Sequence, residues 1–148
     1  MQMSDWINIA ADIEKYYSQY DAFVVLHGTD TMAYTASALS FMLENLGKTV
    51  VVTGSQVPLA EARNDAVDNL LGALTIAGHF VIPEVCLFFA NKLLRGNRSK
   101  KISAIDFDAF DSPNFAPLVK VGINIAVSWE AIFRQTDREK FRAQKSMK

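Results

Sequence analysis

The sequence predicts an α/β domain with a parallel, doubly wound sheet, and three observations support this fold class. Short apolar runs at residues 22–27, 49–53 and 85–89 are typical of buried strands. Helical patterns fill the intervals between them, which favours right-handed crossovers. Polar turns containing glycine follow the first two runs, at the strand ends where open α/β sheets bind ligands.

The first element is a predicted helix, which we expect to begin with Ser4 as its N-cap and Asp5 in its first turn. Its apolar positions recur at near-helical spacing. They are Trp6, Ile9, Ile13, Tyr16 and Tyr17. The run at residues 22–27 follows as the first buried strand.

The next helix is predicted over residues 31–46, with Gly47 as its stop. Thr49 to Thr53 is rich in β-branched residues and predicts the second buried strand. A third helix is expected over residues 63–77, and Gly78 ends it. One face of this helix is apolar, with Val67, Leu70, Leu71 and Leu74. Residues 85–89 form the third strand.

The remainder of the chain is less regular. Residues 91–101 are polar and basic and predict a short hairpin or an extended loop. Residues 111–117 resemble a loop. Residues 123–127 alternate and predict an edge strand. We therefore expect one partial α/β domain over residues 1–135, with residues 136–148 as the start of an interdomain linker or a tail.

Composition limits the function classes. With 148 residues, half of them hydrophobic and a net charge of −1, the chain has the size and composition of one globular domain. The near-neutral charge predicts no nucleic-acid partner and no anionic membrane. No run approaches the roughly 20 apolar residues of a membrane span, and no signal peptide is visible. Cys86 cannot form an internal disulfide, so we expect it to pack as a small apolar residue in a reducing compartment.

The turn at residues 27–31 is the most informative stretch, because it offers hydroxyls, a carboxylate and helix N–H groups together. Gly28 either lets the backbone adopt a conformation that other residues cannot adopt, or lets a ligand approach the backbone closely. A simpler interpretation is that Thr29 or Asp30 only caps the following helix.

Two other clusters, residues 54–58 and 91–101, follow the later strands. A threonine, an aspartate and a lysine meeting there would form an activated nucleophile with its base and an orienting group. The basic residues of the last cluster also fit a solvated loop or a phosphate contact. The spacing of His27 and His79 predicts no structural metal site, and no dinucleotide or P-loop motif is present.

Four motifs follow one another along the chain. They are residues 27–32 (His-Gly-Thr-Asp-Thr-Met), 53–58 (Thr-Gly-Ser-Gln-Val-Pro), 69–74 (Asn-Leu-Leu-Gly-Ala-Leu) and 95–101 (Arg-Gly-Asn-Arg-Ser-Lys-Lys). In their order and spacing they resemble the L-asparaginase family, in its cytosolic type I branch, and the similarity extends from about Trp6 to about Ser128.

This resemblance implies hydrolysis of L-asparagine to L-aspartate and ammonia, without a cofactor or metal, by a cytoplasmic homodimer or homotetramer. Thr29 falls on a catalytic, substrate-binding threonine of the family. Asp30 falls on the aspartate that binds the substrate α-amino group and pairs with the catalytic lysine. Lys101 falls on that lysine, and Lys100 does not. Ser55 falls where a backbone carbonyl orients the substrate amide.

The chain also departs from the family pattern. It lacks the strand with a Thr-Gly-Gly-Thr motif, the Asp-Ser pair that binds the substrate carboxylate, and the smaller C-terminal domain. The resemblance therefore implies a flavodoxin-like N-terminal domain without its first strands, inactive by itself. Two alternatives stay open. One is a non-catalytic truncated isoform or fragment that only associates with other subunits, and the other is the asparaginase-like subunit of a tRNA-dependent amidotransferase.

Overall fold

The computed structural model describes residues 1–135 and 140–146 and contains one mixed sheet of six strands, in the order β1-β3-β4-β5-β8-β9. Strands β1, β3 and β4 pair in parallel, and β5, β8 and β9 continue the sheet in antiparallel pairing. Their bounds are β1 Ala22–Leu26, β3 Thr49–Thr53, β4 Val85–Phe89, β5 Lys92–Arg95, β8 Val119–Val121 and β9 Ile125–Val127. The predicted α/β class is confirmed.

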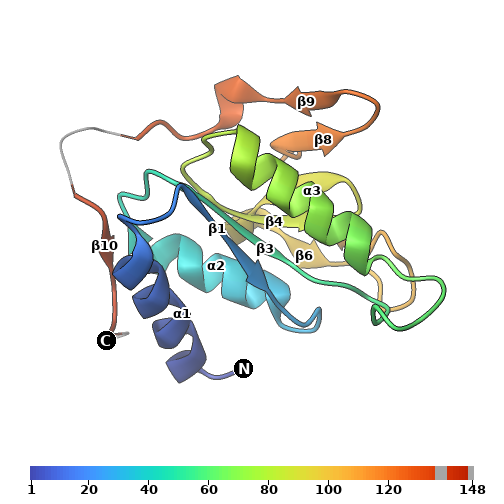
Figure 1. Ribbon diagram of the computed structural model, residues 1–148, viewed down its shortest axis with the longest axis horizontal. Coiled ribbons are helices and arrows are strands. Elements are labelled where there is room, and N and C mark those ends of the chain that lie inside the picture. The colour runs from blue at the N-terminus through green and yellow to red at the C-terminus, as the bar shows by residue number, and fades with distance from the viewer. Residues whose placement is uncertain (136–139, 147–148) are drawn as a thin grey trace.

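Helices cover both faces of this sheet. Helices α1 (Met3–Tyr16) and α2 (Met32–Met42) lie on one face, and α3 (Ala66–His79) lies on the other (Figure 1). Alternation along the strands supplies both cores, since Val50 and Val52 face α1 and α2 while Val51 faces α3. Cys86 is fully buried in β4, as expected, and burial raises the pKa of its thiol well above the ordinary value.

The predicted start of the first helix and the predicted end of the second are wrong. The N-cap of α1 is Gln2 rather than Ser4, and the backbone N–H of Gln2 donates to Asp5 Oδ2 at 2.6 Å. Helix α2 ends at Met42 instead of residue 46. It ends early because Leu43–Glu44 forms a short strand, β2, that pairs antiparallel with β10 (Arg142–Ala143).

Helix α3 is displaced from its predicted range of residues 63–77 and includes Gly78 rather than ending before it. Its buried residues are Asn69, Ala73 and Ile76. Most of the predicted apolar face is exposed, including Val67, Leu71 and Leu74. This exposed face lies next to β1, which is one of the two edge strands of the sheet and is only partly buried.

Residues 91–101 form neither the predicted hairpin nor an extended loop, because β5, a 3-10 helix at Gly96–Arg98 and a two-residue strand at Lys100–Lys101 follow one another there. Strand β5 instead forms a hairpin with the preceding strand β4 through Ala90 and Asn91, whose φ angles of 47° and 65° make a tight turn. β9 is an edge strand, as predicted. Of the predicted linker, residues 136–139 and 147–148 lie outside the described residues. No helix among the described residues has the length and apolar character needed to cross a membrane.

Candidate active site

Three predicted site residues meet beside the carboxyl end of β1. Lys101 Nζ lies 2.9 Å from Thr29 Oγ1 and 3.0 Å from Asp30 Oδ1. Lys101 belongs to the two-residue strand β6 (Lys100–Lys101), which pairs with β7 (Phe110–Asp111). The structure thus joins a hydroxyl, a carboxylate and an ammonium from segments about 70 residues apart in the sequence.

These side chains differ in their exposure to solvent. The Lys101 side chain is 21% exposed, whereas that of Asp30 is 95% exposed. Neither Thr29 nor Asp30 caps α2, because Thr31 is its N-cap residue and makes no side-chain capping bond. The capping interpretation is therefore wrong, and the Asp30 carboxylate is directed to Lys101 instead.

Close contact between two turns fixes the backbone here. The His27 amide donates to the Thr53 carbonyl at 2.8 Å, and a Cβ on Gly54 would lie 2.0 Å from the His27 carbonyl oxygen. Only glycine fits at position 54. Gly28 behaves differently, since its φ is not positive and a Cβ added there would meet nothing within 4 Å. The predicted conformational use is therefore wrong, and the close approach of a ligand at Gly28 stays a prediction.

Two buried side chains at the start of α3 hold the loop that contains Ser55, and the sequence alone gave no role for them. The Asp65 carboxylate accepts hydrogen bonds from the backbone N–H groups of Gln56 and Val57, both at 3.0 Å. Asn69 donates to the Gly54 carbonyl at 2.9 Å and accepts from the Ala90 amide at 3.1 Å. A polar residue on the buried face of an apolar helix was the available signal.

Ser55 is not joined to the Thr29, Asp30 and Lys101 group by any hydrogen bond among the described residues. It lines an apolar groove of about 430 Å³ between the β1 edge and α3. His27 and Gly28 line the same groove, whereas Asp30 and Lys101 line a different one.

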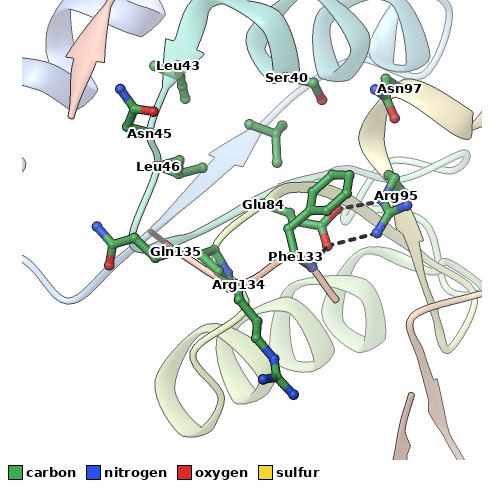
Figure 2. Close-up of a pocket in the computed structure, with 12 residues that line it drawn as sticks. Ser40, Leu43, Asn45, Leu46, Glu84, Arg95, Asn97, Phe133, Arg134 and Gln135 are labelled. Atoms are coloured by element: carbon green, nitrogen blue, oxygen red, sulfur yellow. Dashed lines mark hydrogen bonds and ion pairs between the residues drawn. The ribbon is translucent and has the colours of Figure 1, made fainter. Parts of the chain in front are cut away.

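A second cavity, of about 230 Å³, lies at the amino end of β4, opposite the Thr29 turn (Figure 2). Buried Glu84 and Arg95 form a two-pronged ion pair there, at 2.6 and 3.1 Å. Lys92 pairs with Asp108 at 2.8 Å. The solvated-loop interpretation of the basic cluster is therefore wrong for Arg95 and Lys92, which hold other parts of the fold together.

The Thr29, Asp30 and Lys101 arrangement has the parts needed for amide chemistry. A lysine amine that has given up its proton can take one from a threonine hydroxyl or an attacking water. A solvent-facing carboxylate can bind an ammonium group by a charge-assisted hydrogen bond. Among the described residues, no three His, Cys, Asp or Glu side chains gather in a way that could hold a metal ion.

Comparison with known proteins gives consistent matches. The family model described as "Asparaginase, N-terminal" matches residues 1–133. L-asparaginase 1 of Escherichia coli K12 is 63% identical over 84% of this chain and 37% of that protein. The 60 kDa lysophospholipase of Mus musculus is 56% identical over 89% of this chain and 23% of that protein.

A solved structure agrees with these matches. L-asparaginase I from Vibrio cholerae superimposes with a TM-score of 0.90 and 56% identity, over 97% of this chain and 44% of that one. The chain thus spans less than half the length of these relatives. A component of the glutamyl-tRNA(Gln) amidotransferase of Pyrococcus abyssi is more distant at 37% identity. Because the family model covers most of the sequence and the fold superimposes throughout, this chain belongs to the asparaginase family.

Proposed function

We propose that the chain forms part of an L-asparaginase that hydrolyses L-asparagine to L-aspartate and ammonia. The single observation that supports this most is the Lys101 ammonium within 3.0 Å of both Thr29 and Asp30. In this proposal Lys101 and Thr29 activate the attacking group, and Asp30 binds the substrate α-ammonium. The backbone carbonyl of Ser55 orients the substrate amide.

The proposal includes the setting of the enzyme. The protein acts in the cytoplasm, without a cofactor, as a homodimer or homotetramer with a small-molecule substrate. The first 135 residues are part of the N-terminal domain, and the residues after them begin a linker or tail. The likeness to type I asparaginases supports these features.

The experiment uses a chimeric asparaginase, which is E. coli L-asparaginase 1 with its aligned 125-residue segment replaced by the matching residues of this chain. Release of ammonia from L-asparagine at a rate close to that of the unmodified enzyme supports the proposal. A folded chimera that releases none contradicts it.

The same preparations separate the alternatives. An amidotransferase subunit would bind tRNA, and a protein that acts only through association would bind subunits without turnover. Release of fatty acid from a lysophospholipid would instead favour an acyl-ester hydrolase, the class named for the mouse relative. We expect neither tRNA binding nor fatty-acid release.

A further inference from the structure

A row of hydrogen bonds runs behind the turn that carries Thr29. Trp6 Nε1 lies 2.9 Å from Thr35 Oγ1, and Thr35 Oγ1 lies 2.8 Å from His27 Nε2. His27 Nδ1 lies 2.6 Å from the Gly28 carbonyl oxygen. This relay connects α1 and α2 to the end of β1 and stops one residue before Thr29.

Elementary chemistry fixes the direction of each bond. An indole N–H only donates, so Thr35 Oγ1 accepts from Trp6. Thr35 is fully buried, so its own hydroxyl hydrogen needs an acceptor, and among the described residues its remaining side-chain partner is His27 Nε2. A carbonyl oxygen only accepts, so His27 Nδ1 carries the ring hydrogen. All three bonds are made when His27 is neutral and protonated on Nδ1.

Apart from the contact of His27 with Thr53 and Gly54 and the two Lys101 hydrogen bonds, the described residues give this turn few supports. Residues 27–31 belong to no helix or strand, and Thr31 makes no side-chain capping bond. Among the described residues, and leaving aside the neighbours His27 and Thr29, no atom lies within 4 Å of a Cβ built on Gly28. The imidazole of His27 is therefore the group that ties the Gly28 carbonyl to the two helices.

We propose that His27 is a positioning residue, held in one tautomer by Thr35 and Trp6, that fixes the Gly28 carbonyl and so holds Thr29 against Lys101. The inference rests on the proposed function only in taking Thr29 and Lys101 as the reacting pair. The relay itself is a property of this chain and can be measured without turnover.

The tautomer of His27 is read directly by ¹⁵N magic-angle-spinning NMR of the imidazole in the 148-residue chain, a method that does not require the chain to be monomeric. At about pH 8 an unperturbed histidine is neutral, since its ordinary pKa is roughly 6.5. We expect His27 to carry its hydrogen on Nδ1, with Nε2 unprotonated. The second histidine, His79, is exposed at the end of α3 and its Nδ1 also lies 2.8 Å from a carbonyl oxygen, that of Thr75, so its signal shows the Nδ1-protonated tautomer outside the relay. A hydrogen on Nε2 of His27, or a mixture of tautomers, would overturn the proposal.

Two substitutions at Thr35 test the coupling to Lys101. Thr35→Val removes the hydroxyl with little change in shape, and Thr35→Ser keeps it. We expect Thr35→Val to give a mixture of His27 tautomers and to shift the NMR signals of the Thr29 amide and of Lys101 Cε. In Thr35→Ser we expect the single tautomer and the native positions of these two signals. The indole signal of Trp6 should move with Val, whereas that of exposed Trp129 should stay. Unchanged Thr29 and Lys101 signals in a folded Val variant would refute the positioning role.

If Thr35→Val does not fold, substitutions of His27 test the same coupling. In His27→Asn the amide nitrogen can replace Nδ1 and donate to Gly28, and in His27→Gln the amide reaches Thr35 instead. We expect Asn to keep the Thr29 and Lys101 signals closer to native than Gln does, with His79→Asn as the control. The reverse order would overturn the proposal. If these results hold while the chimeric asparaginase releases no ammonia, the proposed function fails and the relay stands.

Discussion

Asp30 carries a charge that faces solvent and Lys101 rather than the helix that follows it. Its side chain is 95% exposed, and its Oδ1 is 3.0 Å from Lys101 Nζ. Since an exposed carboxylate in one weak ion pair adds little to folding, its use is better sought in binding. An ammonium group of a substrate is the partner that this geometry suits.

Replacing Asp30 by Asn should therefore harm substrate binding far more than stability. Asn keeps the size and hydrogen-bonding capacity of the side chain but removes its charge, and a hydrogen bond to a charged group is worth about 1.5–3 kcal/mol. In the chimeric asparaginase we expect kcat/KM for L-asparagine to fall by at least about tenfold, with the Tm nearly unchanged. Equal losses of stability and activity would instead indicate a structural role.

At the level of single elements, Asp65 and Asn69 connect α3 to the loop at residues 54–58. Asp65 is 8% exposed and accepts from two amides of that loop and from Asn69 Nδ2. Removing the carboxylate leaves those amides without this partner in a largely buried site. This kind of loss has a substantial effect on stability.

We expect Asp65→Ala to lower the free energy of unfolding by about 2 kcal/mol. Asp68→Ala is the matched control, because Asp68 lies on the same turn of α3 but is exposed, and its effect should stay below about 1 kcal/mol. Urea unfolding of the two variants measures the difference. Similar values for both would show that Asp65 does not hold the loop.

Carboxylates attach the C-terminal segment to α1 and β2. Hydrogen bonds from Lys145 and from the Ala143 amide hold the pKa of Glu14 below its ordinary value of 4.5. Gln144 and then Arg142 lower the pKa of Glu44 in the same way. Because both pKa values are depressed in the folded state, the contacts are complete above the unfolded value and are lost as the pH falls through the folded values.

Acid should therefore release residues 140–146 before the sheet unfolds. Amide hydrogen exchange at Ala143, compared with Leu87 in β4, measures this between about pH 6 and about pH 3. We expect protection at Ala143 to disappear first, and the pH dependence to be weaker when Glu14 and Glu44 are both replaced by Gln. Simultaneous loss at Ala143 and Leu87 would contradict this account.

The elements that could be predicted are those whose pattern is local. The β-branched and aromatic runs in β3 and β4 were identified because every residue in them is buried. The helix predicted at residues 31–46 is too long, because Leu43 pairs with Ala143, 100 positions away, and the local sequence contains no sign of this strand pairing. For the same reason the meeting of Lys101 with Thr29 was expected from strand ends and a family resemblance, whereas the roles of Thr35, Trp6 and Asp65 became visible only in the fold.

In the folded molecule, strand β1 forms an apolar edge of the sheet that no other described strand covers. Its five residues contain no charge and no proline, and in the described part of the chain β1 pairs only with β3. Apolar grooves of about 430 and 420 Å³ flank this edge on the two faces of the sheet. Such edges pair readily with other chains, and apolar patches favour association.

The isolated chain should therefore self-associate at micromolar concentration, as measured by light scattering. Leu26 is 66% exposed at this edge, so Leu26→Lys should reduce association by placing a charge there. Val81→Lys is the control, because Val81 is 70% exposed but does not line either groove. A monodisperse monomer that melts cooperatively at about 60 °C would show that the edge is stable by itself.

We propose that Lys101, and not its neighbour Lys100, acts in catalysis together with Thr29 and Asp30. The most direct measurement is ammonia release from L-asparagine by the chimeric asparaginase carrying Lys101→Ala or Lys100→Ala. Lys101 makes both hydrogen bonds to the Thr29 turn, whereas Lys100 is exposed. We expect Lys101→Ala to reduce turnover by several orders of magnitude and Lys100→Ala to have a mild effect. Equal losses of turnover in the two variants, or a larger loss in Lys100→Ala, would contradict the proposed role of Lys101.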